Sequence, residues 1–104
     1  MVFKVSFSRQ AAIDFAEILN YISGELQNRK AANRFYNEVA KKLKLLRKMP
    51  YMFPLYHNES IGDKGFRYII IDNYLVFYLI EDGKSAVYIA RILYGKQDIA
   101  ALLN

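Results

Sequence analysis

The residues best suited to chemistry are two arginines that stand in otherwise apolar segments. Arg67 opens the stretch "RYIIIDNYLVFY", whose other residues suit a buried β-hairpin. Arg91 interrupts a second apolar run closer to the end of the chain. Because a guanidinium carries paired donors that match phosphate oxygens, both side chains are candidates to bind a phosphate or another anionic target.

Each arginine also has a structural interpretation. Arg67 can stack on the ring of Tyr78 as a cation–π pair, and Arg91 can form an ion pair with a nearby carboxylate. The neighbouring side chains that can contact bases or phosphate, or else pack and face solvent, are Tyr74, Tyr78, Tyr94 and Lys96. Both interpretations are open for all of these residues.

Residues 29–48 form a strongly basic segment. They include eight basic residues and a single acid, Glu38, so their net charge is +7 while that of the whole chain is +5. A basic helix attracts nucleic acid or an acidic protein. Lys41, Lys44 and Arg47 are therefore candidate contacts to a target or to RNA, with a solvated helix face as the alternative.

The spacing of apolar residues predicts a single α+β domain over residues 1–104. Alternation over residues 2–7 predicts a strand, and Ser8 and Asn28 are expected to cap two helices, the second of which ends at Pro50. The positions expected to face the core are Ala12, Phe15, Ala16, Leu19, Ile22 and Leu26 in the first helix and Ala32, Phe35, Val39, Leu43 and Leu46 in the second. Three further strands are expected at Phe66–Ile71, Tyr74–Ile80 and Ala86–Leu93. We expect an antiparallel helical hairpin on one face of a four-stranded, mainly antiparallel sheet.

Two-residue turns at residues 72–73 and 82–83 predict how these strands pair. The resulting pairs are Arg67–Tyr78, Ile69–Val76 and Ile71–Tyr74 across the first turn, and Tyr78–Val87, Val76–Ile89 and Tyr74–Arg91 across the second. One face then carries Arg67, Arg91, Tyr74 and Tyr78 around Ile69, Val76 and Ile89. The other carries Phe66, Tyr68, Ile70, Leu75, Phe77, Leu79, Tyr88, Ala90 and Ile92. Because the second face is wholly apolar or aromatic, we expect it to pack on the helices and the first to be open for function.

The order of elements, the motifs "NYLVFY" and "ARILYGKQD" and the basic second helix resemble the RelE/ParE superfamily. Its members are the toxins of bacterial type II toxin–antitoxin modules and are often described as plasmid stabilisation proteins. The resemblance covers nearly the whole chain and is most specific from Phe66 through Asp98. It implies a growth-arresting toxin that a cognate antitoxin neutralises. RelE-like members cut messenger RNA on the ribosome, whereas ParE-like members act on DNA gyrase.

The resemblance makes Arg67 a candidate catalytic residue, because it matches a basic position of the superfamily. Arg91 is the second candidate, because an apolar strand has little other reason to end its run with an arginine. Leu75 and Gln97 stand where nuclease members commonly carry basic residues, and residues 100–103 lack the tyrosine or histidine that such members use. These departures favour a ParE-like or undetermined target over an RNase. Cleavage of messenger RNA on the ribosome and poisoning of DNA gyrase both stay open, as does enzymatic activity. The alternative is a non-toxic protein-binding module that keeps the fold without the activity.

The remaining expectations concern partners, cofactors and location. Ile13, Ile18 and Tyr36 lie off the expected core stripes and are candidates to line an antitoxin groove. With His57 as the only histidine and no cysteine, we expect no metal site, and no other cofactor is implied. No apolar run approaches the roughly 18 residues of a membrane helix, so we expect a cytoplasmic protein.

Overall fold

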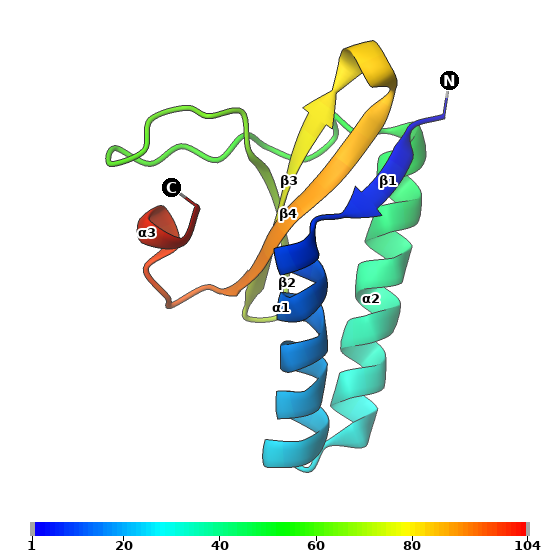
Figure 1. Cartoon of the computed structure of the whole chain (residues 1–104). Helices are drawn as coiled ribbons and strands as arrows, with labels where there is room; N and C mark the ends of the chain where they lie inside the picture. Colours follow the sequence, from blue (N-terminus) through cyan, green and yellow to red (C-terminus); the bar gives the residue numbers. More distant parts are fainter. Residues whose placement is uncertain (1, 104) are drawn as a thin grey trace.

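A helical hairpin covers one face of a four-stranded sheet in the computed structural model, which describes residues 2–103 (Figure 1). The elements are β1 (Lys4–Phe7), α1 (Arg9–Asn20), η1 (Tyr21–Glu25), α2 (Arg29–Lys48), β2 (Arg67–Ile71), β3 (Tyr74–Glu81), η2 (Asp82–Lys84), β4 (Ala86–Tyr94) and α3 (Ile99–Leu103). The strand order is β1-β4-β3-β2, with β1 parallel to β4 and the other pairs antiparallel. The predicted α+β architecture is confirmed.

Side-chain caps fix where both helices of the hairpin begin. The Ser8 hydroxyl accepts the Ala11 amide proton at 3.0 Å and donates to the Ala90 carbonyl at 2.8 Å. It therefore starts α1 and ties it to β4 at the same point. The Asn28 side chain accepts the Ala31 amide proton at 3.0 Å and starts α2. Both predicted caps are confirmed.

The two helices pack their apolar stripes on the same face of the sheet. The α2 stripe is as predicted, with Phe35 and Val39 fully shielded from solvent. The α1 stripe is rotated from the prediction, since Ala11 is buried while Ala12 and Ala16 are exposed. The shift follows from Ser8, whose bond to β4 sets the rotation of the first turn. Leu26, also predicted in the core, is 56% exposed beyond the π-helical turn η1.

The β2–β3 register is as predicted, with Arg67 opposite Tyr78, but the predicted β3–β4 register is wrong. The observed pairs across β3 and β4 include Tyr78–Ile89, Val76–Ile92 and Tyr74–Tyr94. Two irregularities cause the difference. Residues 82–85 form a four-residue connection, with Ser85 in the left-handed region at φ 48°, and a bulge shifts the pairing between Phe77 and Tyr78. Because a one-residue slip turns every later side chain to the other face, Arg91 pairs with Phe77.

The predicted assignment of the two sheet faces is also wrong. The face with Ile69, Val76 and Ile89, expected to be open, packs on the helical hairpin, and all three side chains are at most 2% exposed. Tyr78 is buried there as well, because its hydroxyl donates to the Pro50 carbonyl at 2.7 Å and leaves no polar atom unpaired. Tyrosine therefore does not mark an open surface in this sheet.

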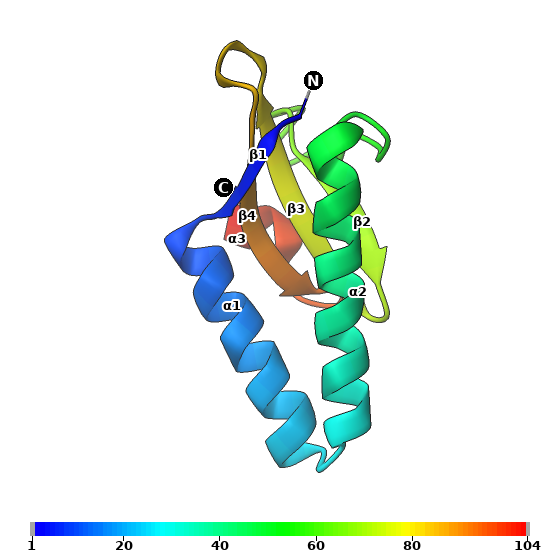
Figure 2. The same cartoon turned by 90° about the vertical axis from the view of Figure 1, so that its right-hand side faces the viewer.

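The opposite face has a smaller core of its own. Phe77 and Leu93 are buried there beneath Ile99 and Leu103 of α3, and Phe66, Tyr68 and Leu75 pack around them. Figure 2 shows α3 on the side of the sheet away from α1 and α2. The short C-terminal helix thus covers a face that the helical hairpin leaves uncovered. Ile70 of the same face, predicted under the helices, is 64% exposed at the outer strand.

Candidate functional site

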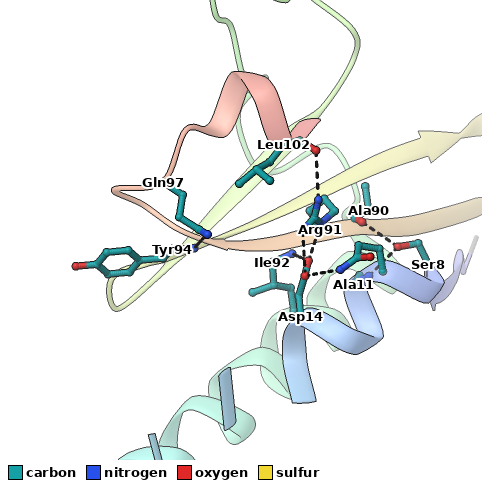
Figure 3. A network of polar contacts seen from close by, with 10 residues as sticks. Ser8, Ala11, Asp14, Ala90, Arg91, Ile92, Tyr94, Gln97 and Leu102 are labelled. Atoms are coloured by element: carbon teal, nitrogen blue, oxygen red, sulfur yellow. Dashed lines mark hydrogen bonds and ion pairs between the residues drawn. The ribbon is translucent and has the colours of Figure 1, made fainter. Parts of the chain in front are cut away.

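Arg91, one of the two candidate catalytic residues, forms a two-point ion pair with Asp14 of α1 (Figure 3). Its Nε lies 2.8 Å from Asp14 Oδ2 and its Nη2 lies 3.1 Å from Oδ1. The Asp14 carboxylate also accepts the Ile92 amide proton at 3.0 Å and a proton of the Gln10 amide at 3.0 Å. Of the two alternatives for Arg91, the structure contains the ion pair.

The electrostatics of the pair keep both partners charged. Burial alone would raise the pKa of Asp14, but hydrogen bonds from Arg91, Gln10 and the Ile92 amide outweigh it and lower that pKa below its usual value. The bond to Asp14 raises the pKa of Arg91 despite the desolvation of the guanidinium. The remaining donor, Arg91 Nη1, reaches the Leu102 carbonyl of α3 at 3.3 Å. The guanidinium of Arg91, on β4, is thus bound by residues of both α1 and α3.

Arg67, the second candidate, lies on the other face of the sheet and is also engaged internally. Its Nη1 donates to the Phe53 carbonyl at 2.6 Å and to the Tyr51 carbonyl at 3.4 Å. Its ζ-carbon lies 5.1 Å from the centre of the Tyr51 ring, which takes the place expected for Tyr78 in a cation–π pair. The prediction that Arg67 and Arg91 share one open face is wrong, because the β3–β4 bulge places them on opposite sides.

The three tyrosines predicted to contact a target differ in accessibility. Tyr78 is fully buried, and burial raises its pKa to about 12, so the prediction that it contacts a target is wrong. Tyr74 is half-buried, with its ring 5.1 Å from that of Phe35 and 5.8 Å from that of Tyr94. Tyr94 is 38% exposed at the end of β4 and is open to a ligand.

A groove of about 720 Å³ lies between the helical hairpin and the ends of β3 and β4. Tyr21, Tyr74 and Tyr94 line it together with Glu17 and Ile18. The Asp14–Arg91 pair also lines this groove, as do Gln10, Leu26, Asn73, Ile92, Leu93 and Gln97. Figure 3 shows Tyr94 and Gln97 at the end of the strand, beyond the ion pair. The Gln97 side chain accepts the Tyr94 amide proton at 3.0 Å and so fixes the chain at this point.

The basic residues of α2 lie on the surface. Lys41, Lys44 and Arg47 are exposed, as is Lys96 in the turn after β4. Lys41 lies 3.5 Å from Glu38, an exposed contact that contributes little stability. These side chains are sterically available to an anionic partner.

Two of the three candidate antitoxin contacts are well exposed. Ile13 is 43% exposed on α1 and Tyr36 is 53% exposed on α2. Ile18 is half-buried, packs against the main core and lines the groove described above. The ring of Tyr36 stacks on that of the half-buried Phe15 of α1 at 5.7 Å, which links α2 to α1.

Asp14 is the residue of this region that the sequence analysis missed. Its partner is 77 positions away in the chain, so no local pattern indicates the pair. The sequence does contain one signal that Asp14 is buried. It lies at helical spacing in an apolar stripe with Ala11, Ile18 and Ile22. An acid in the middle of an apolar stripe is expected to be paired when it is buried.

Residues 2–103 contain no candidate metal site and no membrane-spanning helix. No group of three or more metal-ligating side chains comes together in this range. None of its helices is long and apolar enough to cross a membrane. His57 lies exposed in the irregular segment before β2.

Comparison with known proteins identifies the family. The sequence model described as the ParE toxin of a type II toxin–antitoxin system, parDE, matches residues 5–99. No curated protein matches the chain. The fold is similar to the chromosomal ParDE system of P. aeruginosa, with a TM-score of 0.69 and 18% identity over 89% of this chain and 96% of that one.

Two RelE-type structures share the fold as well. A free-state variant of the E. coli toxin RelE has a TM-score of 0.61 and 16% identity over 98% of this chain and 93% of that one. The RelBE2 toxin–antitoxin complex of Mycobacterium tuberculosis has a TM-score of 0.52 and 16% identity over 90% and 99%. At these identities the likeness concerns the fold, and the family match rests on the sequence model. The chain belongs to the ParE toxin family and is a toxin component of a type II toxin–antitoxin system.

Proposed function

We propose that this toxin arrests bacterial growth by binding DNA gyrase in the cytoplasm, that it does not cut messenger RNA, and that a cognate antitoxin neutralises it. The observation that carries the proposal is the engagement of both strand arginines. Arg91 is bound to Asp14, and Arg67 is bound to the Phe53 carbonyl, on opposite faces of the sheet. Cleavage of RNA needs cationic groups that converge on one phosphate.

The phenols give little support to a nuclease mechanism. The pKa of Tyr74 is raised, chiefly by burial, and that of Tyr78 is raised to about 12 by burial. The hydrogen bond to Asp82 raises the pKa of Tyr51. A general base works best when its pKa lies near the pH of the reaction. These shifts move the three phenols away from that range.

Binding to a target still requires a surface, and α2 supplies one. Its exposed cations, among them Lys41, Lys44 and Arg47, suit an acidic protein surface or DNA held by a protein. The antitoxin is proposed to cover Ile13 and Tyr36, since exposed apolar side chains on a helical hairpin suit an amphipathic partner. The toxin–antitoxin complexes among the similar structures support such a partner.

Two assays on the purified protein test the mechanism. In the first, DNA gyrase supercoils a relaxed plasmid in the presence of increasing toxin, and we expect loss of supercoiling or cleaved plasmid. In the second, a reconstituted translation reaction is followed by primer extension on its messenger RNA, and we expect no new cleavage sites.

Expression of the chain alone in a bacterium provides the cellular control. We expect growth to stop and to resume when the antitoxin is co-expressed. Cleaved messenger RNA with normal supercoiling would replace the gyrase proposal with ribosome-dependent cleavage. Normal growth, with neither assay affected, would favour the alternative of a binding module that keeps the fold alone.

A further inference from the structure

Tyrosines from three different elements line the groove between the helical hairpin and the sheet. Tyr21 comes from η1, Tyr74 from β3 and Tyr94 from β4. The rings of Tyr74 and Tyr94 lie 5.8 Å apart in an edge-to-face arrangement. Tyr21 and Tyr94 are 49% and 38% exposed, so a ligand in the groove can reach both rings.

The charge of this groove is opposite to that of the protein. Its side chains other than tyrosine include two carboxylates, Asp14 and Glu17, and one cation, Arg91, which is already paired with Asp14. The Glu17 side chain makes no hydrogen bond or ion pair with any part of the chain that the structure describes. The groove therefore carries about one unpaired negative charge in a chain of net charge +5.

Aromatic rings beside an unpaired carboxylate form a site that suits a cation. A guanidinium or ammonium gains from the negative face of each ring and from the opposite charge of the acid. A phosphate would be repelled from the same place.

We propose that the groove binds an arginine or lysine side chain of the antitoxin, with Tyr21, Tyr94 and Glu17 as its contacts. The inference rests on the proposed neutralisation by an antitoxin. Ile18, a candidate antitoxin contact, also lines this groove. A second copy of the chain is a poor occupant, because two molecules of net charge +5 repel each other.

Binding of a short peptide to the full chain tests the proposal directly. The probe is acetyl-alanyl-arginyl-alanine amide, and its control carries citrulline, which has the shape of arginine without the charge. Tyrosine ring signals in NMR spectra report binding at the groove. We expect the arginine peptide, and not the citrulline peptide, to shift the signals of Tyr21, Tyr74 and Tyr94.

Matched variants separate the groove from general effects of charge. Glu17→Gln is expected to weaken the arginine peptide about three-fold, whereas Glu25→Gln, an exposed acid outside the groove, leaves binding unchanged. Tyr94→Leu is expected to weaken it by a similar factor. Its control is Tyr88→Leu, since Tyr88 is also 38% exposed on β4 but lies outside the groove.

The outcomes distinguish this inference from the proposed function. Equal binding of the arginine and citrulline peptides, or no difference between Glu17→Gln and Glu25→Gln, overturns the cation site. Concentration-dependent self-association that Glu17→Gln abolishes also overturns it, because a second copy then fills the groove. Growth arrest and gyrase inhibition by the unaltered protein are measured separately, so the proposed function can stand when the cation site fails.

Discussion

Asp14 and Arg91 stand 77 residues apart in the chain and form a two-point ion pair that joins α1 to β4. Their side chains are only 8% and 21% exposed. The same carboxylate accepts the Ile92 amide proton, and the same guanidinium reaches the Leu102 carbonyl. One pair of charges therefore fixes the positions of the first helix, the last strand and the C-terminal helix. This arrangement explains why an apolar strand contains an arginine.

Removing one partner of this pair is expected to destabilise the protein strongly. Asp14→Asn leaves the Arg91 guanidinium partly buried without a counter-charge, which costs about 3 kcal/mol of the free energy of unfolding. Urea denaturation at pH 7 measures the loss. The control is Asp72→Asn, whose exposed pair with Arg34 at 3.4 Å is worth less than about 0.5 kcal/mol. Equal losses in the two variants would contradict a structural role for Arg91.

The lowered pKa of Asp14 makes part of the stability depend on pH. Because the folded pKa lies below the unfolded value of about 3.9, the unfolded chain takes up a proton first as the pH falls. The contribution of Asp14 is complete above about pH 5 and is lost as the pH falls through the folded pKa. We expect the difference in free energy of unfolding between the wild type and Asp14→Asn to shrink from pH 6 to pH 2.5. A constant difference would rule out this linkage.

Arg67→Ala tests whether the second arginine is structural or functional. The change removes the bond to the Phe53 carbonyl and the stacking on Tyr51, at a cost of about 1–2 kcal/mol in the free energy of unfolding. We expect the folded variant to inhibit gyrase as well as the wild type does per mole of folded protein. Loss of inhibition by a fully folded variant would restore the sequence-based prediction that Arg67 contacts the target.

The fold could be predicted because its signals are local. The capping side chains of Ser8 and Asn28, the apolar stripe of α2 and the tight turn at residues 72–73 each act within a few residues, and each is confirmed. The β3–β4 register could not be predicted in the same way. It depends on a four-residue connection at residues 82–85 in place of a two-residue turn, and on a bulge between Phe77 and Tyr78.

The error in the β3–β4 register also made the predicted candidate site wrong. A shift of one residue moves Arg91 from the face of Arg67 to the opposite face, so the prediction of a shared catalytic surface failed with the register. The face assignment failed for a different reason. A tyrosine among apolar residues suggests an open surface, yet a buried tyrosine is stable when its hydroxyl donates to a carbonyl, and Tyr78 donates to that of Pro50.

Tyr78→Phe isolates that hydroxyl. The ring stays in the core, but the buried Pro50 carbonyl loses its donor at 2.7 Å, and we expect a loss of about 1–2 kcal/mol in the free energy of unfolding. Tyr88→Phe is the control, because Tyr88 is 38% exposed and its hydroxyl can bind water. Thermal unfolding of both variants gives the comparison. An unchanged melting temperature for Tyr78→Phe would mean that the carbonyl finds another donor.

The basic surface of α2 is tested by a change of charge that leaves the core intact. Replacing Lys41, Lys44 and Arg47 with alanine removes three exposed cations, and alanine is a strong helix former, so α2 should persist. We expect weaker inhibition of gyrase and a smaller dependence of inhibition on salt, because long-range attraction between exposed charges is screened by ions. Circular dichroism confirms that the variant is folded before inhibition is compared.

A second triple variant with the same change in net charge completes this experiment. Lys4, Arg9 and Lys84 are also exposed, but they lie on β1, at the start of α1 and in η2 rather than on α2. Their replacement by alanine should leave inhibition close to that of the wild type, with a difference of less than about two-fold. Because both variants carry the same net charge, a larger loss for the α2 variant assigns target binding to that helix. Equal losses would mean that total charge, and not the surface of α2, attracts the target.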